Sequence, residues 1–224
     1  MAVSGVTFEI DIYMARVGES EAIAKGLLAG NQLNDTPLSE KGQGDARNAG
    51  DNLARILKEK GVKEVRVFTA DEVLRMQQTT NLIIEQLKQA GMTCHRQSDH
   101  RLGGKNHGIF NASTKEERTQ NPEKKSERLH RDQLTPEERF KTPIKGGESK
   151  QDIAVKTSLL FQEIYQNRST GAVVIVASNN TVEALTAQLN PEKPYEKMKV
   201  AYLDIVHLKQ SKEKLQFIRI YEKV

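Results

Sequence analysis

The sequence predicts an α/β protein, because segments of strand character and segments of helical character alternate along it. Residues 65–68 form a β-branched and aromatic run, and apolar residues at helical spacing follow over 73–87 until Gly91. Residues 172–177 are continuously apolar, as a strand buried on both faces requires. A chain of 224 residues can bury one sizeable core. We therefore expect a single domain over residues 1–224.

The domain is expected to open with a strand, a loop and a helix. Within residues 6–14, apolar and polar residues alternate and lead directly into Arg16, which is typical of a strand that ends in a loop. Ser39 then precedes apolar residues at helical spacing up to Leu57, and Gly61 supplies a C-terminal stop. This order favours a strand followed by its crossover helix.

The rest of the chain divides into regular elements and one irregular excursion. Residues 104–147 are charged and poor in apolar residues, so we expect them to form a cap or insertion on the domain rather than core. A solvated face is the plain interpretation of such a charge run, and a partner-binding surface is the alternative. The other expected elements are a short strand over 92–96, helices over 153–164 and 182–189, and two late strands over 200–208 and 215–221.

Composition narrows the classes of partner. The net charge of +4 and the pI near 9.0 are mild, because 30 acidic residues are interspersed with 34 basic ones. Aromatic residues make up 5% and Trp is absent, so a base-stacking surface for nucleic acid is not expected. No apolar run reaches the roughly 18 residues of a membrane helix, and residues 1–10 lack a basic region followed by an apolar stretch, so we expect neither a membrane span nor a secretory signal. A single cysteine, Cys94, fits a reducing compartment, so we expect a cytoplasmic protein, with a secreted effector as the alternative.

Two short motifs stand in sequence at the start of the domain. Arg16-Val17-Gly18-Glu19-Ser20 is followed, after a loop, by Leu38-Ser39-Glu40-Lys41-Gly42. The pair resembles the histidine phosphatase superfamily in its phosphoglycerate mutase branch, where Arg-His-Gly-Glu-Ser precedes a Leu-Ser-Glu-Lys-Gly-like turn. The resemblance implies a three-layer α/β/α sandwich with a mostly parallel central sheet.

Further family landmarks follow in the expected order. Arg75, soon after the second strand, corresponds to the family's second phosphate-clamping arginine. The run of residues 101–108 is similar to the family's Arg-Leu-Asn-Glu-Arg-His-Tyr-Gly, which puts Gly104 in the place of the acid/base glutamate. Residues 147–149 resemble the Gly-Glu-Ser that opens the next helix. Ser178, at the end of the buried strand, occupies the place of the second catalytic histidine.

These departures remove the chemistry that the resemblance would otherwise imply. In active members one imidazole becomes phosphorylated, a second histidine stabilises the transferring group, and a carboxyl group moves the proton. Val17 has no lone pair, Gly104 has no side chain, and Ser178 offers a neutral hydroxyl. We therefore expect no catalytic residues at these positions.

We expect the protein to bind anions even though it lacks the catalytic residues. Arg16 and Arg75 offer planar, bidentate donors to a phosphate or carboxylate. The resemblance adds Lys105 and Asn180 to this anion-binding set, and it assigns Arg131 a contact with the substrate carboxylate. The plain alternatives are salt-bridged structural arginines and, for residues 178–180, a polar turn that caps the following helix.

Two histidines outside the family's catalytic positions are candidates for a relocated nucleophile. His107 borders the expected pocket and His100 lies just before it, so a relocated nucleophile is the hypothesis that they support. The other histidines follow no metal-ligand spacing, and no metal or cofactor is expected.

Three hypotheses follow. The leading one is a catalytically inactive member, a pseudoenzyme, that binds a phosphate-bearing or other anionic ligand or a protein partner. The rival is an active phosphatase or mutase with a rewired site that uses His107, His100 or Ser178. The third is a scaffold that works through residues 104–147. The expected partners are a phosphate-bearing small molecule, a phosphoprotein or another protein, without nucleic acid or membrane, and homo-oligomer formation stays open.

Overall fold

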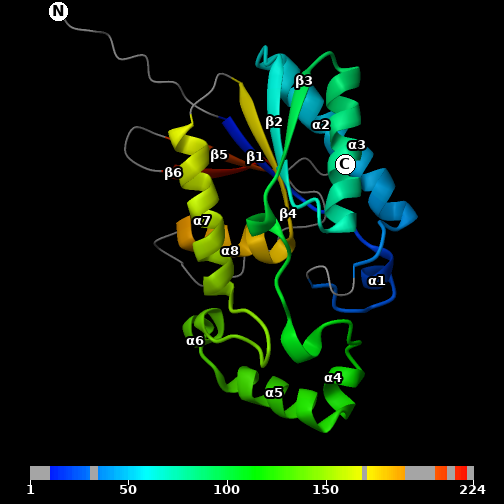
Figure 1. Ribbon diagram of the computed structural model, residues 1–224, viewed down its shortest axis with the longest axis vertical. Coiled ribbons are helices and arrows are strands. Elements are labelled where there is room, and N and C mark those ends of the chain that lie inside the picture. Colours follow the sequence, from blue (N-terminus) through cyan, green and yellow to red (C-terminus); the bar gives the residue numbers. More distant parts are fainter. Residues whose placement is uncertain (1–10, 31–34, 168–170, 190–204, 211–214, 221–224) are drawn as a thin grey trace, which may run out of the picture.

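Six strands form one sheet in the part of the chain that the computed structural model describes, residues 11–30, 35–167, 171–189, 205–210 and 215–220 (Figure 1). Their order across the sheet is β3-β2-β4-β1-β5-β6. Neighbours from β3 to β1 run parallel, whereas β5 pairs antiparallel with both β1 and β6. The bounds are β1 Asp11–Arg16, β2 Glu64–Thr69, β3 Thr93–Ser98, β4 Ala172–Ala177, β5 Ile205–Gln210 and β6 Leu215–Ile220.

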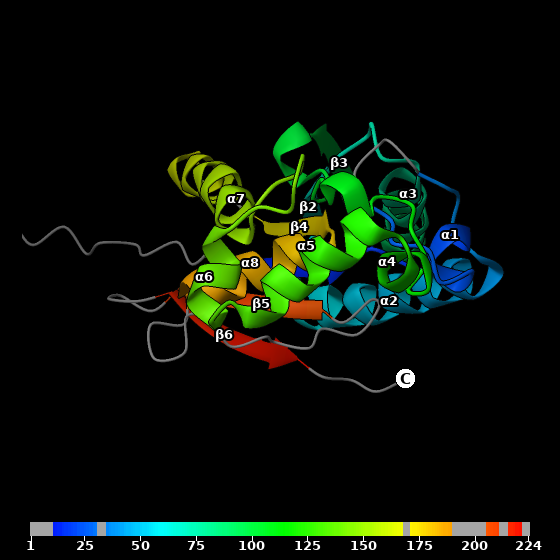
Figure 2. The same ribbon diagram turned by 90° about the horizontal axis from the view of Figure 1, so that it is seen from below.

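Helices cover both faces of this sheet. On one face, Tyr13 of β1 and Val174 of β4 pack against α2 (Glu40–Glu59) and α3 (Leu74–Gln89). On the other face, the alternate strand residues pack against α7 (Lys150–Gln166) and α8 (Asn179–Leu189). Figures 1 and 2 show these two helix pairs on opposite sides of the strands. The three-layer sandwich and the mostly parallel sheet are thus confirmed.

The central strand is the one that the apolar run predicts. β4 lies between β2 and β1, and all six of its residues are buried. Successive side chains of a strand point to opposite faces, so a strand with helices on both sides must be apolar throughout. The register pairs Arg16 at the end of β1 with Ala177 at the end of β4. The loops that follow both strands therefore leave the sheet side by side.

Most predicted elements are confirmed, with shifted ends. β1 extends to Arg16, and the predicted stretch over 6–10 lies outside the described residues, as do residues 200–204 of the predicted late strand. α8 begins at Asn179 rather than at 182, because Ser178 already accepts a hydrogen bond at its start. The short helix α1 (Glu21–Ala24), capped by Ser20, was not predicted.

The charged excursion contains three helices that apolar periodicity does not reveal. They are α4 (Glu117–Gln120), α5 (Pro122–Gln133) and α6 (Pro136–Lys141), and none buries a whole residue. Their boundary signals are present in the sequence, since Asn121 and Thr135 cap helices that begin with proline. We call α4 to α6 the cap helices. They lie below the sheet in Figure 1 and in front of it in Figure 2. No described helix is long and apolar enough to cross a membrane.

Candidate anion-binding site

The two opening motifs meet in space. Ser39 N–H donates to Glu19 O at 2.9 Å, and Ser39 Oγ donates to Glu19 Oε1 at 3.0 Å. The contact needs glycine at Gly42, where an added Cβ would lie 2.1 Å from Glu19 O. The segments 16–20 and 38–42 therefore pack directly against each other in the folded protein.

Helix α3 holds both motifs from the side. The Gly18 N–H donates to Thr79 Oγ1 at 3.2 Å, and the Leu38 N–H donates to Gln78 Oε1 at 2.7 Å. Arg75 lies one turn earlier on the same helix. The loop after β1, the turn before α2 and the start of α3 therefore form one hydrogen-bonded unit.

Val17 is part of the apolar core. Its side chain is 4% exposed and belongs to the cluster that includes Met14, Phe68 and Val182. Its N–H donates to Ala177 O at 2.9 Å, which continues the pairing of β1 with β4. The position that the resemblance gives to the nucleophile thus carries a packed aliphatic group.

Arg75 is engaged by the protein itself. Nη1 pairs with the Asp35 carboxylate and Nη2 donates to Gly30 O. The side chains of Arg75 and Asp35 are 3% and 9% exposed, so this is a buried ion pair. A carboxylate of the chain occupies one edge of the guanidinium that the sequence predicts for a phosphate ligand.

The surroundings of Gly104 leave no room for a side chain. An added Cβ would lie 2.6 Å from Gly30 O and 3.2 Å from Arg75 Nη2. Because the nearer of these neighbours is backbone, a side chain at this position would have to displace the backbone at Gly30. The position that the resemblance gives to the acid/base glutamate therefore has no space for a side chain.

We expect Gly104→Ala to destabilise the protein by about 1–3 kcal/mol, since it overpacks a buried backbone contact. Gly44→Ala is the matched control, because Gly44 is exposed on α2 and an added Cβ meets nothing within 4 Å. The control should gain about 0.5–1 kcal/mol from helix propensity. Urea unfolding of the two variants measures both values. Equal stabilities would refute the close packing at Gly104.

Ser178 works as a helix cap. Its Oγ accepts a hydrogen bond from the Thr181 N–H at 3.2 Å and lies 3.0 Å from Thr181 Oγ1. The side chain is buried, at 6% exposed. Asn180 follows on the first turn of α8 and approaches His107 Nε2 with its Nδ2 at 3.4 Å. The turn after β4 therefore brings Asn180 to the loop that carries Lys105 and His107.

A cavity of about 710 Å³ lies between this turn and the cap helices. The described residues that line it include six cationic side chains and a single carboxylate, Glu183, which pairs with Lys150. It opens beyond the carboxyl ends of β1, β3 and β4, where ligands of parallel α/β sheets bind. The cations are Lys105, Arg118, Arg128, Arg131, Arg139 and Lys150, and the apolar part is formed by Leu28, Phe110, Leu134, Pro136, Phe140 and Ile144.

Lys105 is the most unusual of these cations. It is 5% exposed, and it has no hydrogen-bond or ion-pair partner among the residues that the structure describes. Burial and the charges of Arg131 and Lys150 lower the pKa of its ammonium group to about 8, and they outweigh the carboxylates of Glu148 and Asp152, which act in the opposite direction. An ammonium held in this way is a vacant cationic partner for an anion.

The arginines of the cap helices are oriented by backbone carbonyls. Arg131 donates to Thr142 O at 2.9 Å and to Arg139 O at 3.3 Å, and Arg118 donates to Ser113 O at 2.6 Å. Burial lowers the pKa of Arg131. Because these carbonyls bear no net charge, they position the guanidinium groups without neutralising them.

His107 is neutral within this cationic surrounding. It is 8% exposed, and burial together with the charges of Lys105 and Arg118 lowers its pKa to about 3. Its backbone N–H donates to Asn111 Oδ1 at 3.0 Å, which fixes the loop. The imidazole therefore adds a polar but uncharged wall to the cavity.

This shift predicts a loss of stability in acid. The unfolded chain binds a proton on His107 below pH about 6.5, whereas the folded chain does so only near pH 3, so stability falls as pH drops through that interval. At pH 5 the loss from this group is about 2 kcal/mol. His107→Gln should remove it, and His130→Gln, on the exposed face of α5, should not. Urea unfolding at pH 7 and pH 5 tests the difference; equal pH dependence of the two variants would contradict it.

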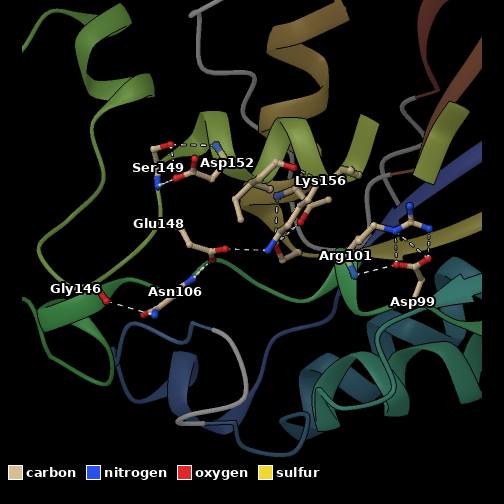
Figure 3. Close-up of polar contacts among 12 residues, drawn as sticks. Asp99, Arg101, Asn106, Gly146, Glu148, Ser149, Asp152 and Lys156 are labelled. Atoms are coloured by element: carbon tan, nitrogen blue, oxygen red, sulfur yellow. Dashed lines mark hydrogen bonds and ion pairs between the residues drawn. The ribbon is translucent and has the colours of Figure 1, made fainter. Parts of the chain in front are cut away.

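A polar strut fixes the loop that presents Lys105 and His107 (Figure 3). Glu148 Oε2 accepts from the Asn106 N–H at 2.7 Å, while Glu148 Oε1 pairs with Lys156 Nζ at 3.1 Å. The next residue, Ser149, caps α7 through a capping box with Asp152. The Gly-Glu-Ser motif thus joins the start of α7 to the cavity loop.

Other charged groups lie outside the cavity. Arg101 bridges Asp99 and Glu163, and its hydrogen bonds to the Asp99 carboxylate lower the pKa of that group. Figure 3 shows Arg101 beside Asp99. His100 is exposed in the 3-10 helix His100–Leu102 and does not line the cavity. Among the described residues, no group of three or more His, Cys, Asp or Glu side chains could hold a metal ion.

Three of the five predicted anion-binding residues line the cavity. These are Lys105, Asn180 and Arg131, whereas Arg16 and Arg75 are not part of the cavity lining. Sequence reasoning missed the partner of Arg75 and four cavity cations: Arg118, Arg128, Arg139 and Lys150. One signal was available, since Arg128 and Arg131 are three residues apart on α5 and therefore share a face.

Comparison with solved structures places this fold in a class. A mycobacterial glucosyl-3-phosphoglycerate phosphatase is 21% identical, with 93% of this chain and 96% of that chain covered and a TM-score of 0.68. A protein described as mycobacterial hydrolase 1 is 21% identical, with 96% and 98% covered and a TM-score of 0.71. A phosphoglycerate mutase from Bacillus anthracis is 18% identical, with 95% and 92% covered and a TM-score of 0.66. The molecule has the phosphoglycerate mutase-like α/β fold.

A comparison of the sequence with models of known protein families identifies its family. The model of the histidine phosphatase superfamily, branch 1, matches residues 12–223, so the chain belongs to that superfamily. No curated protein sequence matches it.

Proposed function

We propose that this protein is a catalytically inactive member of the superfamily that binds an anionic, phosphate-bearing small molecule in the cavity under the cap helices. The observation that carries the proposal is Lys105, a buried ammonium without a partner among the described residues, in a cavity lined by cations. A buried charge is destabilising unless it is paired, and an anionic ligand supplies the pair.

Three features support inactivity. Val17 is a packed core residue, Gly104 has no space for a carboxyl side chain, and Ser178 caps α8. Loss of a general acid alone lowers rates by about 10² to 10⁴, and loss of the nucleophile removes the covalent route. Phosphate-ester hydrolysis needs accelerations of up to about 10²¹, which electrostatic stabilisation by the remaining cations does not supply.

Two features support an anion site under the cap helices rather than at the opening motifs. Arg75 already holds a carboxylate of the chain, so one half of the predicted phosphate clamp is occupied. Among the cavity cations, Lys150 pairs with Glu183, the one carboxylate in the described lining, whereas Arg118 and Arg131 are held by neutral carbonyls and Lys105 has no ion-pair partner among the described residues. The electrostatic potential for an anion is therefore most favourable beside Lys105 and Arg131.

A rewired enzyme is the second candidate, and one observation favours it. His107 is an uncharged imidazole in the cavity, among cations that would stabilise a transferring phosphoryl group. In that case His107→Gln would abolish phosphate release. In the binding protein that we propose, there is no release for the substitution to abolish.

Phosphate release and calorimetric titration of the same samples test the proposal. The ligands are inorganic phosphate and 3-phosphoglycerate, on wild type, Lys105→Met, Arg131→Met and Arg16→Ala. We expect binding that weakens about tenfold or more in the first two variants, is retained in Arg16→Ala, and gives no turnover. Release at an ordinary enzymatic rate would overturn inactivity. Binding lost only in Arg16→Ala would overturn the cavity as the site.

A further inference from the structure

We propose that Lys105 is a carbonyl-reactive amine, and that the cavity captures anionic aldehydes or ketones as a reversible Schiff base on its Nζ. This inference rests on the proposed function, because the same cationic wall would bind the anionic group of the ligand. It adds a covalent step and a substrate class to that binding.

The position of Lys105 sets it apart from the other cavity lysine. Lys150 also lines the cavity, but its ammonium group is engaged by the Glu183 carboxylate. Lys105 has neither an ion pair nor a hydrogen bond to a described residue, and it lies on a loop fixed through Asn106 and Glu148. The geometry therefore provides an amine on a fixed loop that lines the cavity. Glu148 and Asp152 act on it only through their charge, without an ion pair among the described residues.

The surroundings of Lys105 favour the reactive form of the amine. Lysines that form Schiff bases are desolvated or lie beside other cations, because both conditions release the ammonium proton. Both apply here: burial and the charges of Arg131 and Lys150 lower the pKa to about 8. Roughly a tenth of the molecules then carry a free amine at pH 7.

The reaction balances without an added reagent. The Nζ lone pair attacks the carbonyl carbon, the C=O π electrons move to oxygen, and a proton moves from nitrogen to that oxygen to give a carbinolamine. Protonation of the hydroxyl then expels water as the C=N bond forms. The protonated imine keeps one positive charge, as the ammonium did, and the anionic group of the ligand can balance it. Water is the sole product released, and its addition reverses the step.

The volume and the lining of the cavity restrict the size and the chemical groups of the ligand. Its volume of about 710 Å³ suits a small organic molecule, and its lining combines Arg131 and its neighbouring cations with the apolar side chains of Phe110, Leu134 and Phe140. A matching ligand has a carbonyl group, an anionic group and an apolar or planar body between them. Pyridoxal 5′-phosphate has all three and serves as the probe.

Borohydride trapping on the full chain tests the inference. Wild type is incubated with pyridoxal 5′-phosphate, reduced, and examined by intact mass and peptide mapping, with and without excess 3-phosphoglycerate. We expect one reduced adduct at Lys105 that 3-phosphoglycerate suppresses. Lys105→Arg keeps the charge and should lose the adduct. Lys58→Arg should keep it, because Lys58 is an exposed lysine on α2, outside the cavity lining.

The outcomes separate this inference from the proposed function. Adducts spread over exposed lysines, or equal labelling of Lys105→Arg and wild type, would overturn the imine. Calorimetric binding of 3-phosphoglycerate without an adduct at Lys105 would overturn the imine alone. Absence of both binding and adduct would overturn both. The peptide map of wild type decides the point even if Lys105→Arg does not fold, which its circular dichroism spectrum would reveal.

Discussion

Lys105→Met is expected to stabilise the ligand-free protein by about 2 kcal/mol at pH 7 and to weaken anion binding about tenfold or more. The gain arises because Met fills the same volume without the desolvated charge. Binding weakens because the partnerless ammonium is then absent from the cavity. A residue whose removal makes the protein more stable and less able to bind is retained for its function rather than for the fold.

The pH dependence of this effect has a definite sign. The pKa of Lys105 is about 8 in the folded protein and about 10.5 in the unfolded chain, so the folded chain releases the proton first. The unfolded chain binds more protons between these values, so wild type should gain stability as pH rises from about 8 to 10.5. Below pH 8 the penalty of the buried charge is fully present. Lys105→Met should lack this gain.

Thermal and urea unfolding at pH 7 and pH 10 measure both effects. Lys156→Met is the control, since it removes a lysine that is paired with Glu148 and should not stabilise the protein. A Lys105→Met protein that is less stable than wild type and still binds 3-phosphoglycerate would contradict the assignment of Lys105.

Arg75→Met is expected to destabilise the protein by about 3–5 kcal/mol. It leaves the Asp35 carboxylate and Gly30 O without the cation that they share in the interior. Breaking a buried pair in this way is costly because one charge stays behind, whereas replacing both partners with apolar groups is often close to neutral. The double variant Arg75→Met/Asp35→Leu should therefore recover much of the lost stability.

A double-mutant cycle in urea tests this expectation, with the coupling between positions 35 and 75 as the result. Anion binding should persist in the double variant, because neither residue lines the cavity. Near-wild-type stability of Arg75→Met combined with lost anion binding would show that Arg75 is a ligand clamp, as the resemblance implies, and not a structural cation.

Local sequence patterns predicted most of the fold. The strand β4 is buried on both faces, so its residues form a continuous apolar run. The helix α3 is buried on one face, so its apolar residues recur at helical spacing. Both patterns are visible in consecutive stretches of the sequence. The cap helices escaped prediction because they are short and exposed, so they lack an apolar stripe. Capping residues at Asn121 and Thr135 were the remaining signal.

The candidate site was predicted in part. The resemblance selected Lys105, Asn180 and Arg131, which the fold brings to one cavity from three distant segments. It could not show that Asp35 occupies Arg75, because the two are 40 residues apart and their pairing depends on how the loop around Gly30 packs. The resemblance also could not show that Arg128 and Arg139 line the cavity, because in sequence they look like the solvated charges around them. Only their position in the folded protein distinguishes these two arginines from those charges.

The most direct test of the central claim is a diffraction experiment that locates a bound tetrahedral anion. Crystals of the wild-type protein soaked in tungstate would show the anion by its anomalous scattering. We expect the peak under the cap helices, beside Lys105 and Arg131. A peak beside Arg16 and Val17, with the cavity unoccupied, would contradict the claim that anion recognition has moved away from the family's phosphate site.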